Sequence, residues 1–441
     1  MSDFRRTVKY RNAVGIVRTL RSAGHEAYLV GGCVRDLVMG RAPKDYDVAT
    51  DARPEQVAQR FRRTIPVGAQ FGVQIVMIGA TPYEVATFRT DQEYKDGRHP
   101  EGVLFSSPKE DALRRDFTVN GLFYDPLEKR VIDYVGGRED LKRKLIRAIG
   151  DPAKRFSEDK LRMLRAVRFA AALDFKVDPA TFKAVQSGAG RITEVSPERI
   201  REELVGIFTG PNPGRGLELL DESGLLKVIL PEVENMKGVQ QPPEFHPEGD
   251  VFVHTRMVLD GLPNSSPVVA IGALLHDVGK PSTFRVADRI RFDGHDRVGA
   301  KMAQGICRRF RFSNAETDAV SELVGEHMKF KDVRQMRLST LKRFMANPLF
   351  PEHMKLHRAD CMASHKDLTN WNFLRRKLKA MPKEELKPKP LIDGHDLLGL
   401  GYPEGPQIGL ILKAVEERQL EKELDSKAGA LAWVFEAFPK R

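Results

Sequence analysis

The chain has 441 residues, which is too long for one compact hydrophobic core, so we expect two to four domains. Hydrophobic residues make up 41% and charged residues 30%, as in an ordinary globular protein, and the absence of any run of about 18 apolar residues excludes a membrane-spanning helix. The formal net charge of +11 favours partners that carry phosphate, although charge alone supports nucleic-acid binding only weakly.

The first 150 residues alternate short strands with helices. Apolar residues at helical spacing predict a helix over residues 8–23. The residues between 89 and 106 are mostly polar and predict a mobile loop, after which Ser107-Pro108-Lys109-Glu110 is a capping box that should begin a helix. Buried or half-buried strands are expected at four places: 27–30, 45–49, 73–78 and 83–88.

Beyond residue 151, helical periodicity replaces the strand signals. Ser157 is expected to cap one helix that runs to about Leu173, and a second helix should begin after Ser196-Pro197. Together these patterns predict an α+β chain in which a mixed α/β domain precedes all-helical domains. The expected divisions are the α/β domain at 1–150, a helical neck at 151–245, a histidine-rich helical domain at 246–365 and a helical C-terminal tail at 366–441.

A glycine turn and a pair of carboxylates stand close together near the N-terminus. Gly31 and Gly32 lie between a strand and a helix, where the backbone can approach a phosphate and Arg35 can add a charged contact. Asp45 and Asp47 alternate along the next expected strand, so both side chains should project from one face. Two like charges held together need a cation, and Mg²⁺ prefers such oxygens together with substrate phosphates. The combination predicts metal-assisted chemistry on a phosphate ester, with Asp45 and Asp47 as metal ligands.

Five motifs in order resemble those of the class II nucleotidyltransferases, the family of bacterial tRNA nucleotidyltransferases and poly(A) polymerases. The first is YLVGGCVRDLVMGRAPKDYDVAT, and the second is ALRRDFTVNGLFYDP. The resemblance covers roughly residues 25–210 and implies a palm-type catalytic domain with a helical neck and body, an activity of template-independent nucleotide addition, and Mg²⁺ as the catalytic cofactor. The motifs occupy residues 28–50, 112–126, 132–152, 155–171 and 196–204.

Within the second motif, three side chains are expected to contact the incoming nucleotide. Arg115 suits the triphosphate, and either Asp116 or Asn120 can accept a hydrogen bond from the ribose 2′-hydroxyl, which would favour ribonucleotides. The family usually has alanine where this chain has Gly121, a difference that should leave the chemistry unchanged.

In the fourth motif, the resemblance implies that Asp159 and Arg162 read the base. Asp159 can accept from the exocyclic amine of cytosine or adenine, while Arg162 donates to the adjacent ring nitrogen. Uracil and guanine present the opposite pattern, so the pair admits C and A without a template. Arg165 and Arg168 are expected to contact phosphate or to hold Asp159. Three side chains of the fifth motif should brace that helix: Glu198, Arg199 and Glu202.

Three products fit these motifs: the whole CCA end of tRNA, a single terminal A, and a poly(A) tail. Residues 89–100 resemble the loop of members that add A, which disfavours a CC-only enzyme. Residues 66–73 lack the basic signature of the poly(A) polymerases. CCA addition from CTP and ATP to tRNA is therefore the first choice, and A-only addition or poly(A) synthesis remains an alternative.

The helical region after residue 246 contains histidines and aspartates at metal-ligand spacing. LLHDVGKP at residues 274–281 resembles the HD phosphohydrolases, which implies one or two divalent transition metals that activate water for phosphoester hydrolysis, with cyclic phosphates at RNA ends among the substrates considered. A helical body that grips tRNA and merely retains the ligands is the alternative. The expected ligands are His254, His276, Asp277, His295, His327 and Asp360.

Two rival interpretations remain at this point: an HD-type hydrolase of RNA ends with a degenerate transferase half, and an RNA-binding protein without catalysis. The intact aspartate pair and base-reading pair argue against both. Three scattered cysteines and a charged beginning without a signal peptide favour a reducing cytoplasm and no membrane partner. The sequence leaves the oligomeric state open.

Overall fold

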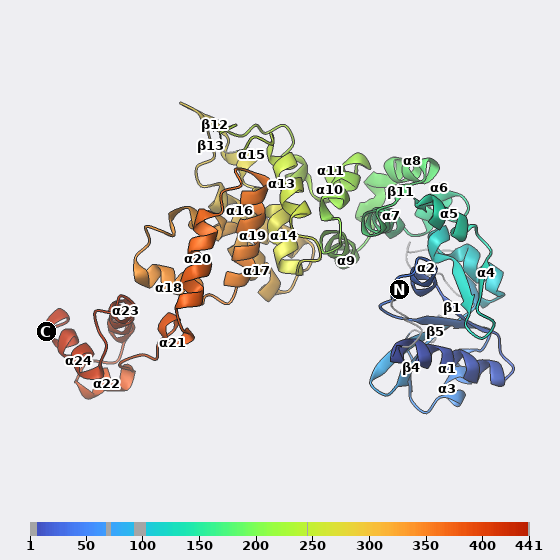
Figure 1. Ribbon diagram of the computed structural model, residues 1–441, viewed down its shortest axis with the longest axis horizontal. Helices are drawn as coiled ribbons and strands as arrows, with labels where there is room; N and C mark the ends of the chain where they lie inside the picture. The colour runs from blue at the N-terminus through green and yellow to red at the C-terminus, as the bar shows by residue number, and fades with distance from the viewer. Residues whose placement is uncertain (1–6, 68–71, 92–102, 245, 440–441) are drawn as a thin grey trace. The chain divides into compact units, whose positions relative to one another are not determined.

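The computed structural model describes residues 7–67, 72–91, 103–244 and 246–439, and it divides the chain into two compact units. The first unit is Met1–Glu234 and the second is Asn235–Arg441. Strands gather in the first unit, whereas the second consists almost entirely of helices (Figure 1). This distribution confirms the predicted α+β class, while the four-domain division remains a prediction.

A seven-stranded mixed sheet forms the framework of the first unit. Its order is β3-β4-β5-β2-β1-β8-β9, and every neighbouring pair is antiparallel except β2 and β5. β1, next to the central β2, is buried except at the partly exposed Tyr28, as expected from Ala27-Tyr28-Leu29-Val30. The strands are β1 Ala27–Val30, β2 Asp47–Thr50, β3 Thr64–Ile65, β4 Val73–Ile78, β5 Thr81–Thr87, β8 Leu122–Asp125 and β9 Arg130–Asp133.

Five helices and a small core accompany this sheet. Phe88 and Phe123, with ring centroids 6.2 Å apart, pack with Val30, Ala49 and Ala112 in one buried cluster. Ser107 caps α4 in the predicted capping box. The helices are α1 Val8–Ser22, α2 Gly32–Val38, α3 Pro54–Arg60, α4 Pro108–Arg114 and α5 Gly137–Arg143.

The two ends of the predicted 89–106 loop are strands. Residues of β6 Arg89–Asp91 pair antiparallel with β7 Val103–Phe105, so the loop expectation was wrong at both ends. Residues 92–102 lie outside the described part of the chain. The strand β6 lies next to α4.

Helices also make up the rest of the first unit, and one of them differs from the sequence expectation. Residues 157–173 do not form one helix, because α6 ends at Glu158 and α7 begins at Leu161. Asp151, not Ser157, caps α6 with its side chain. The helices are α6 Pro152–Glu158, α7 Leu161–Leu173, α8 Pro179–Gly188, α9 Pro197–Phe208, α10 Pro213–Glu222, α11 Leu225–Ile229 and α12 Pro231–Glu234, with β10 Leu145–Ile146 paired to β11 Lys176–Val177.

The second unit is built from helices, and hydrophobic clusters lie among those of its C-terminal part. One contains Phe330, Phe344 and Phe350. Another lies wholly within the C-terminal tail and includes Leu397 and Ile411, so the tail has a core of its own. The helices are α13 Val251–Asp260, α14 Pro267–Leu275, α15 Lys280–Thr283, α16 His295–Arg309, α17 Asn314–Glu326, α18 Leu338–Ala346, α19 Phe350–Ala363, α20 Thr369–Ala380, α21 Lys383–Leu386, α22 Gly394–Gly399, α23 Pro406–Leu420 and α24 Lys427–Ala437; a hairpin of β12 Arg285–Val286 and β13 Ile290–Arg291 joins α15 to α16.

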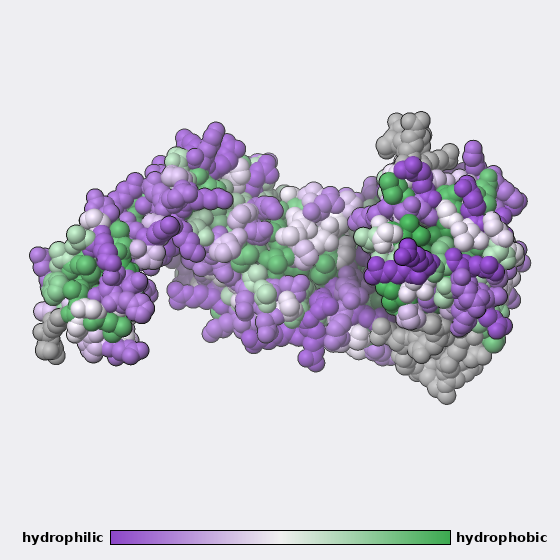
Figure 2. Space-filling view, turned by 90° about the horizontal axis from the view of Figure 1, so that it is seen from below, coloured by the Kyte–Doolittle hydropathy of each residue, from purple (hydrophilic) through white to green (hydrophobic). Residues whose placement is uncertain are grey.

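Hydrophilic residues predominate on the face of the molecule that Figure 2 shows, and apolar residues form only small patches there. Some apolar side chains of the tail are nevertheless exposed, among them Leu410 and Phe435. Among the described residues, no helix combines the length and the apolar character needed to cross a bilayer.

Candidate functional site

A cavity of about 440 Å³ in the first unit gathers residues from three of the five motifs. Every residue predicted to bind nucleotide lines it, and so does Asp47, whereas Asp45 does not. The lining consists of Gly31, Gly32, Arg35, Asp47, Arg114, Arg115, Asp116, Asn120, Asp159, Arg162, Arg165, Arg168 and Phe169. Residues that are 137 positions apart in the sequence therefore form one polar, strongly basic pocket.

The glycine turn at the pocket wall has a specific steric cause. Gly31 has a φ of 73° and lies between the last residue of β1 and the first residue of α2. A Cβ atom at this position would lie 3.1 Å from Nη1 of Arg115. A larger residue at position 31 would therefore strain the backbone and push the arginine out of place.

The two aspartates of the first motif lie differently from each other. Asp47 is the first residue of β2 and pairs with Val30, the last residue of β1. Because β1 ends there, Asp45 has no strand partner, and the predicted strand over 45–49 begins two residues late. The side chain of Asp45 is 85% exposed and its Oδ1 lies 3.5 Å from Nζ of Lys9.

Asp47 carries negative charge that the protein does not balance. Burial, together with the charges of Glu84 and Asp45, raises its pKa to about 6 against the opposing charge of Arg115. Glu84 lies beside Asp47 because β2 and β5 run parallel in register, with Val48 opposite Val85. The sequence reasoning missed this third carboxylate, whose only signal was its place in the strand next to β2. Carboxylate oxygens with excess negative charge suit a hard divalent cation.

Each arginine of the pocket is held by a carboxylate that it contacts directly. Arg115 donates to Oδ2 of Asp111 at 3.0 Å, and Arg165 donates twice to Oδ2 of Asp116, at 2.6 and 2.9 Å. Arg168 donates to Glu203 at 2.6 Å. Burial alone would raise the pKa of Asp116, but the charge and hydrogen bonds of Arg165 outweigh it and lower that pKa.

Asp116 and Asn120 are already linked to each other. Oδ1 of Asp116 accepts from the backbone N–H of Phe117 at 2.7 Å and from Nδ2 of Asn120 at 3.3 Å. Oδ1 of Asn120 accepts from Nη1 of Arg35 at 2.8 Å. The network fixes all these side chains around the pocket, and the suggested contact of Asp116 or Asn120 with a ribose hydroxyl remains a prediction.

The break between α6 and α7 determines where Asp159 points. Asp159 has an extended backbone, with φ −141° and ψ 106°, so its side chain leaves the helical path. Its Oδ1 accepts from the N–H of Leu161 at 3.1 Å, and its Oδ2 accepts from Nη2 of Arg199 at 2.8 Å. Arg162, in the first turn of α7, donates to Oε2 of Glu158 at 2.8 Å. Both predicted base-reading side chains are thus oriented by neighbours before any ligand arrives.

Only one of the three predicted bracing residues makes the expected contact. Arg199 holds Asp159, whereas Glu198 and Glu202 are exposed and make no side-chain hydrogen bond or ion pair within the described residues. Glu203, which the sequence reasoning did not name, contacts both Arg165 and Arg168. Its spacing of four from Arg199, which places the two on one helix face, was the signal that could have identified it.

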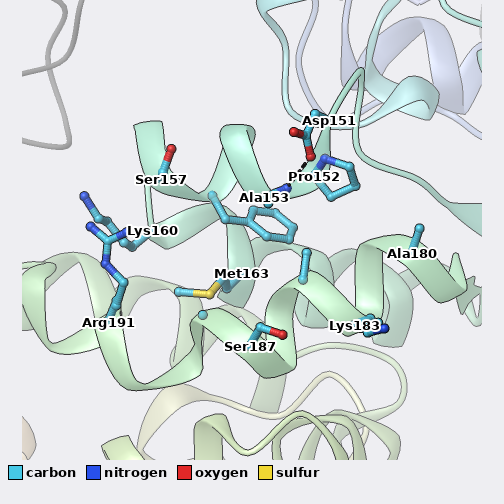
Figure 3. A pocket seen from close by; sticks show the side chains of 13 residues that line it. Asp151, Pro152, Ala153, Ser157, Lys160, Met163, Ala180, Lys183, Ser187 and Arg191 are labelled. Atoms are coloured by element: carbon cyan, nitrogen blue, oxygen red, sulfur yellow. Dashed lines mark hydrogen bonds between the residues drawn. The ribbon is translucent and has the colours of Figure 1, made fainter.

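A second cavity of the first unit, of about 490 Å³, lies among α6, α7 and α8 (Figure 3). Phe156 and Met163 form an apolar part of its wall, and Lys160, Lys183 and Arg191 supply positive charge. Lys160 is the residue next to Asp159, so this cavity adjoins the turn that carries the predicted base-reading aspartate.

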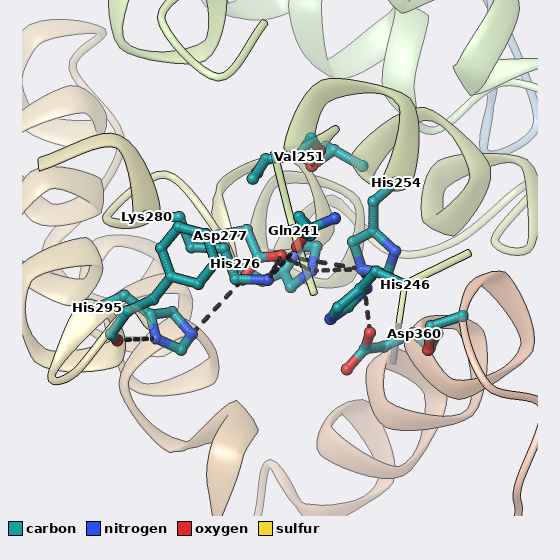
Figure 4. Close-up of polar contacts among 12 residues, drawn as sticks. Gln241, His246, Val251, His254, His276, Asp277, Lys280, His295 and Asp360 are labelled. Carbon is teal, nitrogen blue, oxygen red and sulfur yellow. Dashed lines mark hydrogen bonds and ion pairs between the residues drawn. The ribbon is translucent and has the colours of Figure 1, made fainter. Parts of the chain in front are cut away.

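In the second unit, the six predicted metal ligands converge (Figure 4). The Nδ1 atom of each of three histidines faces a backbone carbonyl three residues earlier, at 2.6 to 2.8 Å, and Nδ1 of His254 faces Glu248 at 2.6 Å. Each Nε2 atom is left to point toward the other ligands. The three carbonyl-bound rings are those of His276, His295 and His327.

The ligands form two groups of three that meet at Asp277. Within each group, one ligand atom per residue lies within 4.8 Å of the others. One carboxylate oxygen of Asp277 lies 3.2 Å from Nε2 of His276, and the other lies 3.5 Å from Nε2 of His295. The geometry and the imidazole and carboxylate donors fit two transition-metal ions that share Asp277. The groups are His254, His276, Asp360 and Asp277, His295, His327.

Lys280 and Glu248 are part of this centre although the sequence reasoning did not name them. Nζ of Lys280 lies 2.7 Å from Oδ2 of Asp277, and the side chain is buried. Burial would raise the pKa of Asp277, but the charges of His276 and Lys280 outweigh it and keep the pKa well below its ordinary value. The spacing of three between Asp277 and Lys280 on a helical segment was an available signal.

Comparisons with known proteins agree with this architecture. Residues 27–147 match the model of the poly A polymerase head domain, residues 174–237 the model of a probable RNA and SrmB-binding site of polymerase A, and residues 251–364 the HD domain. The fold and the two sites therefore define a nucleotidyltransferase-type head domain joined to helical domains and an HD domain.

Relatives that are similar over part of the chain are CCA-adding enzymes, and so is a solved structure with the same fold. The chain is 45% identical over 233 residues to the CCA-adding enzyme of Geobacillus sp. (strain WCH70), covering 53% of this chain and 57% of the relative, and 44% identical over 229 residues to that of Bacillus licheniformis, covering 52% and 57%. The chain thus matches little more than half the length of these curated relatives. It superimposes on the CCA-adding enzyme of Bacillus stearothermophilus in complex with CTP with a TM-score of 0.76 and 27% identity, covering 98% of both chains. The chain is therefore similar to CCA-adding enzymes and carries a segment that matches the poly A polymerase head domain.

Proposed function

We propose that the protein adds C and A residues, from CTP and ATP, to the 3′ end of tRNA without a template and releases pyrophosphate. The observation that carries this proposal is the single pocket in which Asp47 faces the same space as Asp159 and Arg162. A nucleotide held there meets cation ligands at its phosphates and a donor and acceptor pair at its base. The names of the relatives and the CTP bound to the Bacillus stearothermophilus enzyme support the proposal.

Asp45 and Asp47 would hold Mg²⁺ in this pocket, with Glu84 adding negative charge beside them. When bound, Mg²⁺ supplies the positive charge that activates the 3′-hydroxyl of the tRNA and stabilises the leaving pyrophosphate. Arg115, held by Asp111, is positioned to contact the triphosphate. Gly31 lets that arginine lie against the turn, so the phosphates and the glycine backbone approach each other closely.

Base choice follows from the fixed orientation of Asp159 and Arg162. Arg199 and the backbone of Leu161 hold the carboxylate, which then accepts from the amine of cytosine or adenine. Uracil and guanine would place a carbonyl oxygen against that carboxylate, and each unpaired polar group would cost about 1–3 kcal/mol. No nucleic-acid template is needed for this discrimination.

We propose the full CCA sequence as the product, with A-only addition or poly(A) synthesis as the alternatives. The relatives that match about half of the chain are CCA-adding enzymes. The segment that distinguishes A-adding members lies largely at 92–102, outside the described residues, and supports the proposal only through its sequence.

We further propose that the basic cavity among α6, α7 and α8 contacts the tRNA backbone. Part of its wall, including Lys183, lies within residues 174–237, which match the probable RNA-binding model. Lysine and arginine near an apolar wall suit a phosphate next to an unstacked base. Such a substrate would place the enzyme in the cytoplasm, in keeping with three free, buried cysteines.

Incorporation into three tRNA substrates tests the transferase proposal. The substrates end before the CCA, after the first C and after CC, and each is incubated with CTP, ATP or both. Completion of CCA on the shortest substrate is the expected result. A single A added only to the CC-ended tRNA would establish A-only addition, and long A tails on a non-tRNA oligonucleotide would establish a poly(A) polymerase.

The Asp45→Ala variant tests the metal-assisted mechanism directly. We expect it to lose nucleotide addition while the secondary structure of the chain is retained, because Asp45 is exposed and lies outside the core. Glu128→Ala, which removes another exposed carboxylate of the same unit, is the matched control. Persistence of addition in the Asp45 variant would contradict the mechanism.

A second function, hydrolysis of phosphoesters by the HD centre, is favoured by the two ligand groups that meet at Asp277. Two divalent transition metals in that centre would activate water, and Lys280 would hold Asp277 in place. Hydrolysis of 2′,3′-cyclic nucleotides and of simple phosphomonoesters, measured with Mn²⁺, Ni²⁺, Co²⁺ and Zn²⁺ in turn, tests it. If no substrate is hydrolysed with any of these metals, the HD domain has a structural role and no hydrolase activity.

A further inference from the structure

A further group of ligand-type side chains lies in the second unit and includes none of the six HD residues. Glu322 and Glu326 are one turn apart on α17, and His353 belongs to the first turn of α19. One ligand atom from each residue lies within 4.8 Å of the others. The two glutamates are partly exposed, whereas His353 is fully buried.

His353 is buried without a hydrogen-bond partner. Its side chain is 0% exposed, and neither Nδ1 nor Nε2 makes a hydrogen bond. Its Nε2 lies 3.6 Å from Oε1 of Glu322 and 3.9 Å from Oε2 of Glu326. Buried imidazole nitrogens normally take part in a hydrogen bond or bind a ligand. The ring of His353 faces two carboxylates without a hydrogen bond to either, which indicates that a bound group belongs between them.

The distances are wrong for hydrogen bonds and right for ligands of a common ion. A hydrogen bond between nitrogen and oxygen spans about 2.7–3.2 Å. Donors that each lie about 2.0–2.2 Å from a tetrahedral ion are separated from one another by about 3.4 Å. The two measured separations lie near that value, and an ion seated between the three atoms would need only small side-chain movements.

The charged groups around this cluster leave ligand atoms available. Oε1 of Glu326 pairs with Lys329, while its Oε2 is the atom that faces His353. Oε1 of Glu322, the atom that faces His353, also accepts from Nδ2 of Asn347, so it would bind an ion through its remaining lone pair. Burial lowers the pKa of His353 despite the opposing charges of the two glutamates, so the ring is neutral near pH 7 and can offer a nitrogen lone pair.

We propose that Glu322, Glu326 and His353 bind a divalent transition metal of the Zn²⁺ class at a site separate from the HD centre. Two carboxylates and one imidazole suit Zn²⁺, Mn²⁺ or Co²⁺, and a water completes the coordination on the exposed side of the glutamates. The ion ties α17 to α19. The same two helices carry HD ligands, since His327 directly follows α17 and Asp360 lies on α19. The site is therefore a structural clip that supports the HD centre, and it does not depend on the proposed transferase function.

The test counts metal ions in the full-length chain with the HD centre disabled. Asp277→Ala combined with His254→Ala and His295→Ala removes the shared ligand and one histidine from each of the two ligand groups of that centre. The protein is stripped with chelator and titrated with Zn²⁺ alone, and bound zinc is measured by mass spectrometry of the native protein and by elemental analysis. We expect one tightly bound zinc ion per chain in this background. Co²⁺ should report the same site through visible absorption.

Substitutions in the cluster then decide the assignment. In the disabled background, Glu322→Gln with Glu326→Gln should lower zinc affinity by about a hundredfold or more, the upper end of what even indirect contacts to a metal are worth. His353→Gln should do the same, and circular dichroism verifies that each variant is folded. If His353→Gln fails to fold, the partly exposed glutamate pair decides the outcome alone.

The matched control is Asp318→Asn, which removes an exposed carboxylate one turn before Glu322 on α17. It should leave zinc affinity unchanged, because its carboxylate is not in the cluster. The proposal is overturned if the disabled background binds no zinc, if the glutamate pair variant binds it undiminished, or if Asp318→Asn weakens binding as much as that variant does.

Discussion

Replacing Asp159 by alanine should relax the choice of base while leaving the phosphate chemistry in place. The carboxylate is 16% exposed and each of its oxygens already accepts one hydrogen bond, from Leu161 and from Arg199. It is therefore oriented before the nucleotide binds, so binding costs little further side-chain entropy. Asp47 and Arg115 are not contacted by Asp159, so cation and triphosphate binding should persist.

The magnitude follows from what the carboxylate does to the wrong base. A carbonyl oxygen forced against a buried carboxylate leaves both unpaired, at about 1–3 kcal/mol. Because both oxygens of Asp159 are held in place, we take the cost of this unpaired contact with the wrong base as about 2 kcal/mol. This free energy corresponds to about a 30-fold difference between the rates for the right and the wrong nucleotide. The alanine variant should therefore lose about 30-fold in the ratio of kcat/KM for CTP over UTP. Arg162 should maintain the remaining preference.

Single-turnover incorporation of CTP and UTP into tRNA that lacks its CCA end measures this ratio. Arg199→Ala should reduce the ratio less than Asp159→Ala does, because the carboxylate remains but loses one of its two supports. Glu202→Gln, an exposed change on the same helix α9, is the control and should keep the parental ratio. An unchanged ratio in the Asp159 variant would refute the base-reading role.

Three further predictions concern the hydrolase, the stability of the first unit and the RNA contact. Asp277→Ala should abolish phosphoester hydrolysis and leave nucleotide addition intact, as measured with both assays on one preparation. Asp116→Asn should lower the free energy of unfolding, measured in urea, by about 2 kcal/mol, because the partly buried guanidinium of Arg165 loses the nearer of the two carboxylates that it contacts. Since the folded pKa of Asp116 is depressed, its ionised form stabilises the fold above the ordinary pKa of about 4, so this deficit should be constant from about pH 5 to 8 and shrink as the pH falls through the folded pKa. Lys183→Gln should weaken tRNA binding about equally for different tRNAs and reduce its salt dependence by about one phosphate contact, as measured by filter binding at several salt concentrations.

Local patterns were sufficient for elements whose stability is mostly local. The burial of Ala27-Tyr28-Leu29-Val30 and the capping box at Ser107 predicted β1 and the start of α4 correctly. The strand expected at 45–49 instead begins at Asp47, because its pairing partner β1 ends at Val30. Strand ends depend on the neighbouring strand, and sequence periodicity carries no information about that neighbour.

The helix break at Asp159 shows a different limit of sequence reasoning. Residues 157–173 have continuous helical periodicity, and nothing between Glu158 and Leu161 is a glycine or a proline. The break is stabilised by a tertiary contact, since Arg199 of α9 binds the carboxylate of Asp159. A contact 40 residues away in sequence thus overrides local helix propensity, and it does so at a residue expected to read the base.

Carboxylates outside the expected site explain why its charged residues do not neutralise one another. Arg115 lies close enough to Asp47 to lower its pKa, yet it donates its hydrogen bonds to Asp111. If Arg115 instead formed a bidentate pair with Asp47, the carboxylate would no longer be available to a cation, and the arginine would be turned away from the phosphates. The side chain of Asp111 is only 1% exposed, so it cannot reach solvent or substrate without rearrangement. It therefore separates the positive and negative charges of the pocket, so that a cation can bind at Asp47 while a triphosphate binds at the arginines.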